Sequence, residues 1–192
     1  MLTLNEKKVL RLIFLGAKHS INQLAKESGL SPNGAYKMLR KFQEEGVLSY
    51  EEIANSKIYS LDYQNEKTAN VLKLALIEDS LSKKLQSRQE DLKPLRQSAK
   101  ACILFGSYMK NEKPNDMDVL FVIEKGKYPE HKKASKKIYE TMPAKAHEVL
   151  QTEEDFENNL RKKDPVLMEA LKKGIILWGQ DAVIEMVKSA AK

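Results

Sequence analysis

The sequence predicts an α+β chain of two domains joined by a helical connector. Three observations lead to this prediction: short amphipathic helices and a strand pair in the first third, helical periodicity in the middle, and strand-like apolar runs between helical patterns in the last half. With 192 residues, of which 42% are hydrophobic, the chain has enough apolar side chains for two small cores. We expect domains over residues 1–62 and 99–192, with the connector over residues 63–98.

The first segment contains three predicted helices, and two of them have a clear start. Residues 5–15 place apolar side chains at helical spacing. Ser20 and Gln23 have the spacing of a capping box, which predicts the start of a second helix. Ser31 is a plausible cap for the third helix, because Pro32 then occupies the first helical position, where its missing N–H costs nothing. Two strand-like runs follow, at 47–53 and 57–61.

The stretch INQLAKESGLSPNGAYKMLRKFQEEGVLSYE, residues 21–51, resembles the winged helix-turn-helix family. The turn glycine, the capping serine and the EEGVL exit toward the wing all agree with that family. The resemblance implies that the third helix enters the major groove of double-stranded DNA and that the wing reaches a phosphate. The residues it assigns to DNA binding are Asn33, Tyr36, Lys37, Arg40, Lys41 and Lys57. Winged helices also serve as protein-interaction modules, and this alternative stays open.

The connector is predicted to be one long helix over residues 65–98, ended or kinked at Pro94. Its apolar residues recur at spacings of three, four or seven: Val71, Leu74, Leu81, Leu85 and Leu92. This stripe packs either on the chain's own domains or against a second copy, as a homodimer.

The last half predicts a mixture of buried strands and helices. The expected strands are residues 101–105, 117–123 and 146–151, with a last strand or buried turn at 175–178. The expected helices are residues 132–141, two helices that start near Thr152 and Asp164, and residues 182–190.

Two aspartates at the start of one strand are the strongest chemical signal. Asp116 and Asp118 are two residues apart, so both side chains point to the same side of the strand. Paired carboxylates are suitable ligands for Mg²⁺, which shares its remaining positions with substrate phosphates. Gly106 allows close approach of a phosphate to the backbone, and Ser107 adds a hydroxyl.

The stretch FGSYMKNEKPNDMDVLFV, residues 105–122, is similar to the nucleotidyltransferase superfamily that includes DNA polymerase beta, and residues 150–181 resemble the tail of its small members. The resemblance implies that Gly106 and Ser107 bind the nucleotide and that Asp116 and Asp118 hold Mg²⁺ on the triphosphate of an NTP. A third carboxylate on the next strand activates the acceptor hydroxyl, and Glu148 is the acidic candidate there.

The sequence departs from that family at four places. Tyr108 stands where an arginine is common, Asn111 where a glycine is common, and Asn115 where a serine is common. Glu148 is a longer ligand than the usual aspartate. Three outcomes therefore stay open for this domain: an active transferase, a nucleotide-binding or metal-binding sensor, and a structural relic.

Composition limits the possible environments. The net charge of +6 permits nucleic-acid binding, and the single cysteine excludes a disulfide framework. No apolar run approaches the ~18 residues of a membrane span, so we expect a cytoplasmic protein without a membrane partner. The expected function is transfer of a nucleotidyl group from Mg-NTP, with a DNA-binding winged helix. The alternative is a transcriptional regulator with a degenerate transferase domain.

Overall fold

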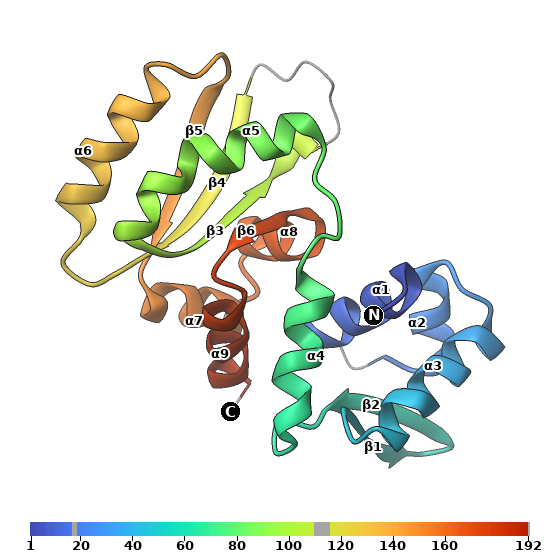
Figure 1. Cartoon of the computed structure of the whole chain (residues 1–192). Helices are drawn as coiled ribbons and strands as arrows, with labels where there is room; N and C mark the ends of the chain where they lie inside the picture. The colour runs from blue at the N-terminus through green and yellow to red at the C-terminus, as the bar shows by residue number, and fades with distance from the viewer. Residues whose placement is uncertain (17–18, 110–115, 192) are drawn as a thin grey trace. The chain divides into compact units, whose positions relative to one another are not determined.

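The computed structural model describes residues 1–16, 19–109 and 116–191. It confirms the α+β prediction and divides into two compact units, Met1–Leu76 and Ile77–Ala190 (Figure 1). The boundary between the units falls inside the stretch expected to be a connector. Each unit has its own hydrophobic cluster of buried side chains.

The first unit is a helical domain with a two-stranded wing. Its elements are α1 (Leu4–Phe14), α2 (Ile21–Ser28), α3 (Pro32–Glu44), β1 (Leu48–Ile53), β2 (Ser56–Leu61) and α4 (Glu66–Leu76). Strands β1 and β2 are antiparallel. The predicted caps are confirmed: Ser20 and Gln23 form a capping box, and the Ser31 hydroxyl accepts a hydrogen bond from Gly34 N–H. Gly29 ends α2 in the left-handed conformation, with φ of 73°.

The expected single helix over residues 65–98 is wrong, because two separate helices occupy this stretch. Helix α4 ends at Leu76, and α5 (Lys83–Leu92) is followed by the 3₁₀ helix η1 (Lys93–Gln97). The break has a local cause: Ser82 adopts an extended conformation and its hydroxyl caps α5, accepting from Leu85 N–H. The pattern of leucines alone could not show this interruption.

The apolar stripe that was expected to pack against a second copy of the chain is therefore not continuous. Val71 packs against the core of the first unit, whereas Leu81 and Leu85 belong to the core of the second. Only Leu74, 53% exposed, remains largely accessible.

The second unit is built on a four-stranded mixed sheet with the order β5-β4-β3-β6. Its strands are β3 (Ala99–Phe105), β4 (Asp116–Ile123), β5 (Lys145–Gln151) and β6 (Ile175–Trp178). Strand β3 is antiparallel to both β4 and β6, and β4 is parallel to β5. The remaining elements are the 3₁₀ turn η2 (Gly106–Met109) and helices α6 (Tyr128–Tyr139), α7 (Glu153–Arg161), α8 (Pro165–Lys173) and α9 (Gln180–Ala190).

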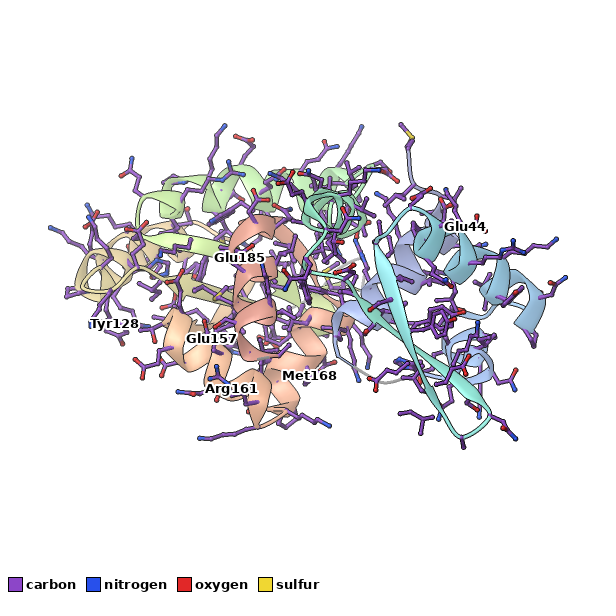
Figure 2. The ribbon with its side chains drawn as sticks, turned by 90° about the horizontal axis from the view of Figure 1, so that it is seen from below. Glu44, Tyr128, Glu157, Arg161, Met168 and Glu185 are labelled. Atoms are coloured by element: carbon purple, nitrogen blue, oxygen red, sulfur yellow. The ribbon has the colours of Figure 1, made fainter. Side chains whose placement is uncertain are left out.

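Helices cover both faces of this sheet (Figure 1). Helices α5 and α6 pack on the face that presents Met117, Val119 and Phe121, whereas α7, α8 and α9 lie against the other face. Helices α7 and α9 are linked by the Ser189 hydroxyl, which donates to Glu157. Figure 2 labels Glu157 on α7 and Glu185 on α9. Because side chains alternate along a strand, each residue of β4 and β5 belongs to one face only.

Candidate nucleic-acid interface and carboxylate sites

Helix α3 presents a polar stripe to solvent. Asn33, Tyr36, Lys37 and Arg40 follow one another at helical spacing, and all four are exposed. The opposite side of the helix is buried through Ala35, Leu39 and Phe42. The core of the unit thus fixes which side of α3 faces outward, and this side holds the amide and guanidinium groups that base recognition requires.

Two of the cations expected on this surface already have acidic partners. Arg40 Nε donates to Glu44 Oε1 at 2.8 Å, and both side chains are exposed. This hydrogen bond raises the pKa of Arg40. Lys41 instead reaches helix α1, where its ammonium lies 2.6 Å from the carboxylate of Glu6, a side chain only 9% exposed. Lys41 therefore clamps α3 to α1, a contact that the sequence analysis missed.

The wing places its cation on an aromatic ring. Lys57 Nζ lies 4.0 Å from the ring centroid of Tyr50, and Tyr50 in turn contacts Tyr59 at 5.8 Å between centroids. Glu52 is directly opposite Lys57 in the strand pair. The wing thus offers one cation beside acidic neighbours, whereas α3 offers three basic residues.

The aspartate pair lies on the sheet face opposite α5 and α6. Asp116 and Asp118 begin β4, with side chains 50% and 31% exposed. His147 of β5 lies between them: its Nε2 is 4.0 Å from Asp116 Oδ1, and its Nδ1 is 3.6 Å from Asp118 Oδ1. Gly106, with φ of 72°, contacts Asp118 so closely that a Cβ at position 106 would overlap its carboxylate. The structure therefore places Gly106 against Asp118, and both aspartates beside His147.

Glu148 does not join the two aspartates, and the expected grouping is wrong in this respect. In the parallel pairing of β4 and β5, His147 is opposite Asp118 and Glu148 is opposite Val119. A step of one residue along a strand reverses the side-chain direction. Glu148 consequently points toward α6, on the other face of the sheet, and His147 occupies the place beside the aspartates.

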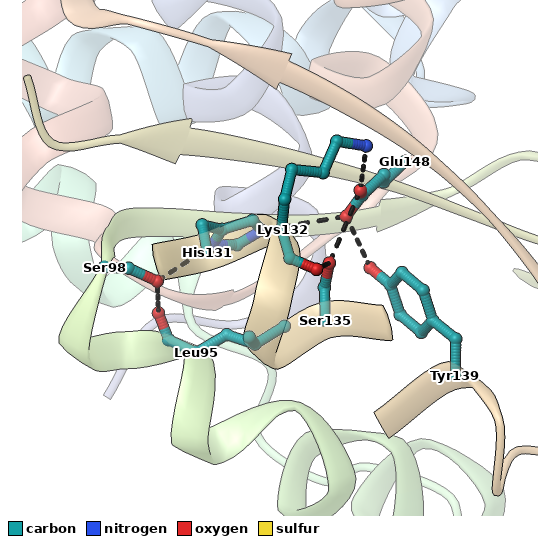
Figure 3. A network of polar contacts seen from close by, with 7 residues as sticks. All are labelled: Leu95, Ser98, His131, Lys132, Ser135, Tyr139 and Glu148. Atoms are coloured by element: carbon teal, nitrogen blue, oxygen red, sulfur yellow. Dashed lines mark hydrogen bonds and ion pairs between the residues drawn. The ribbon is translucent and has the colours of Figure 1, made fainter. Parts of the chain in front are cut away.

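Glu148 is the centre of a polar network under α6 (Figure 3). Its Oε1 accepts hydrogen bonds from the Lys132 ammonium at 2.5 Å and the Ser135 hydroxyl at 3.4 Å. Its Oε2 accepts from the Tyr139 hydroxyl at 3.0 Å and lies 3.7 Å from Nε2 of the fully buried His131. Nδ1 of His131 is hydrogen-bonded to the Ser98 hydroxyl at 2.9 Å.

The network keeps Glu148 ionised. Burial alone would raise the pKa of Glu148, but its contacts with His131, Lys132 and Tyr139 outweigh that effect and lower the pKa to about 2. Burial and the neighbouring carboxylate raise the pKa of Tyr139. A carboxylate so well neutralised is a structural anchor for α6 rather than a group available to a substrate.

A hollow of about 550 Å³ lies above this network. It is lined by Lys132, Ser135, Lys136, Tyr139, Glu140 and Glu148. Its charged groups, two lysines and two glutamates, cancel, so it offers no net charge to a ligand.

The expected metal site is limited to two ligands. Among residues 1–16, 19–109 and 116–191, no group of three His, Cys, Asp or Glu side chains is placed to hold a metal ion. Mg²⁺ is often held by only one or two carboxylates together with substrate phosphates, so Asp116 and Asp118 fit a single ion of this kind. Ser107 lies in the four-residue turn η2, and the departures at Asn111 and Asn115 lie outside the described residues.

Comparison with known proteins identifies the first unit. Residues 2–49 match the family described as winged helix-turn-helix DNA-binding. The N-terminal domain is a winged helix-turn-helix DNA-binding domain. A search of curated proteins finds no match.

Two solved structures show a weaker likeness. A double mutant of ZitR from Lactococcus lactis is 20% identical, with a TM-score of 0.32 over 50% of this chain and 74% of its own. A MarR family protein of Mycobacterium tuberculosis in complex with salicylic acid is 19% identical, with a TM-score of 0.30 over 49% of this chain and 77% of its own. In the described part of the chain, none of the helices is long and apolar enough to cross a membrane.

Proposed function

We propose that this chain is a DNA-binding transcriptional regulator whose C-terminal domain does not transfer nucleotides. The observation that carries the proposal is the exposed stripe of α3 within a winged helix-turn-helix DNA-binding domain. In this proposal Lys37 contacts a phosphate, whereas Asn33 and Arg40 read base edges in the major groove. Arg40 must leave Glu44 to do so, which costs little because both side chains are exposed to water.

Duplex binding by single variants tests this proposal. We expect Arg40→Ala and Lys37→Ala to weaken binding to double-stranded DNA, and Lys37→Ala to reduce the slope of log K against log salt by about 0.9. Lys8→Ala is the matched control, because Lys8 is an exposed lysine of α1 in the same domain. A loss in the control as large as that in Lys37→Ala, or binding that does not depend on salt, contradicts the proposal.

A second candidate is nucleotide binding by the C-terminal domain, favoured by the contact of Gly106 with Asp118 and by the shared face of Asp116 and Asp118. The two aspartates would hold one Mg²⁺ ion, which supplies charge neutralisation for a triphosphate. Glu148 cannot serve as the third acid from the opposite face, so we propose binding of an NTP without transfer. Thermal unfolding with Mg²⁺ and each NTP tests binding, and a pyrophosphate assay tests transfer. Pyrophosphate release that is lost in Asp116→Asn would overturn this assignment.

A homodimer remains part of the proposal, with a smaller surface than the sequence predicted. Leu74 of α4 is the one exposed member among the five leucine and valine positions of the predicted stripe. We expect Leu74→Glu to shift a dimer toward monomer in sedimentation without loss of fold. Sedimentation of the wild type as a monomer at micromolar concentration would remove this part of the proposal.

A further inference from the structure

Helix α6 carries more net positive charge than helix α3, although it lies in the other unit. Its helix and C-cap, residues 128–140, contain four lysines and two glutamates, which gives a net charge of +2. Helix α3 with its C-cap, residues 32–45, contains three basic residues and two glutamates, which gives a net charge of +1. The packing of α6 on the sheet, through buried residues such as His131 and Ser135, does not require this charge.

The two helices differ in how much of this charge is already neutralised. In α3, Arg40 and Lys41 are paired with acids, so Lys37 is the basic residue without an acidic partner in the described part of the chain. In α6, Lys132 is paired with Glu148. The other three lysines, all exposed, have no acidic partner within the described residues: Lys133, Lys136 and Lys137.

Packing fixes these three lysines on the outer side of α6. His131 and Ser135 are buried toward the sheet, and Tyr139 reaches inward to Glu148. Glu130, at the start of the helix, is paired with Lys127. Glu140, at its end, lines the hollow together with Lys136, and no ion pair joins the two among the described residues. We name the exposed set of Lys133, Lys136 and Lys137 the α6 lysine face.

Helix stability explains only part of this arrangement. Lys136 and Lys137 lie in the last turn, where cations interact favourably with the helix dipole. Lys133 is a turn earlier, and three like charges at neighbouring positions of a helix repel one another. The repulsion is relieved when a polyanion binds.

We propose that the α6 lysine face contacts phosphates of the DNA to which the winged helix binds. This inference rests on the proposed DNA-binding function. Lysine ammonium groups are point charges that suit phosphates, and the face lacks the amide and guanidinium groups that read base edges. The contact is therefore independent of DNA sequence and adds to affinity rather than to specificity.

The test uses the full chain and a pool of random 30-base-pair duplexes, titrated at several salt concentrations. If each lysine neutralises one phosphate, the triple variant Lys133→Ala, Lys136→Ala, Lys137→Ala reduces the slope of log K against log salt by about 2.7. The matched control is Lys162→Ala, Lys172→Ala, Lys173→Ala, which removes the same charge from exposed positions at the ends of α7 and α8. Circular dichroism checks that both triple variants remain folded.

The outcomes separate this inference from the proposed function. A wild type that does not bind duplex DNA removes both. If the wild type binds and Arg40→Ala weakens binding, but the two triple variants have the same slope, the winged helix binds DNA and the α6 lysine face does not. A slope of log K against log salt that is reduced in the α6 triple variant, but not in the control triple variant, supports the contact between the α6 lysine face and DNA phosphates.

Discussion

Carboxylates on the two faces of the C-terminal sheet differ in burial and in the partners that neutralise them. Asp118 and Glu148 lie on neighbouring strands, one register position apart, yet they point to opposite faces. The Glu148 side chain is 10% exposed and accepts hydrogen bonds from Lys132, Ser135 and Tyr139. Asp118 is 31% exposed, and among the described residues only His147 lies within 4 Å of its carboxylate as a possible cation.

This difference shows that the role of an acid in a strand follows from the face on which it lies. A buried carboxylate must be neutralised by hydrogen-bond donors, and those donors in turn need the carboxylate as their acceptor. Exposed, adjacent carboxylates repel each other and gain from an added cation. Neutralising substitutions on the two faces should therefore change stability in opposite directions.

The largest expected effect is on the buried side. Glu148→Ala removes the acceptor of the Tyr139 hydroxyl and of the Lys132 ammonium beneath α6. It also removes the carboxylate that lies 3.7 Å from Nε2 of the buried His131. Leaving buried polar groups unsatisfied typically costs 1–3 kcal/mol each, and we expect the free energy of unfolding to fall by about 2–4 kcal/mol. Urea unfolding measures the change. A loss below about 0.5 kcal/mol would show that the network does not stabilise the domain.

Acid should remove the same stabilisation from the wild type. The pKa of Glu148 is about 2 in the folded chain, against an ordinary value of 4.5. Because the folded value is lower, the contribution is complete above pH 4.5 and is lost as the pH falls from 4.5 toward 2. It amounts to roughly 3 kcal/mol at most. The stability difference between the wild type and Glu148→Gln should shrink over this interval, and a difference that stays constant contradicts the assignment.

A smaller effect is expected from the cation of the network. The Lys132 side chain is 44% exposed, so water replaces much of what its ammonium gives to Glu148. We expect Lys132→Ala to cost about 1 kcal/mol, well below Glu148→Ala. Unfolding of both variants under the same conditions makes the comparison, and equal losses would mean that the ion pair, rather than the hydroxyl donors, holds the carboxylate.

The sequence predicted the elements better than it predicted the site. Caps at Ser20 and Ser31 depend on neighbours three residues away, so local spacing is sufficient to find them. The break before α5 depends on one capping residue, Ser82. The periodic leucines on either side of Ser82 predict a continuous helix, so their pattern does not reveal the break.

The prediction of the site was wrong at Glu148 for a different reason. Asp116 and Asp118 share a face because they lie two apart in one strand, a relation that the sequence contains. The position of Glu148 depends on the register between β4 and β5, which no local pattern gives. The pairing of Glu148 with Lys132 and Tyr139, and of Lys41 with Glu6, likewise joins separate elements.

The smallest expected effect, with the opposite sign, is at the aspartate pair. Asp118→Asn removes one of two neighbouring carboxylates, so the free energy of unfolding in metal-free buffer should stay constant or rise by less than about 1 kcal/mol. Any stabilisation of the wild type by Mg²⁺ and an NTP should disappear, because a single carboxylate remains. Ser107→Ala is the control for the turn, since it keeps both carboxylates and should retain the Mg²⁺ effect. Thermal unfolding of the three proteins with and without Mg²⁺ measures this. A loss of stability in metal-free Asp118→Asn comparable to that of Glu148→Ala would show that the two faces do not differ as proposed.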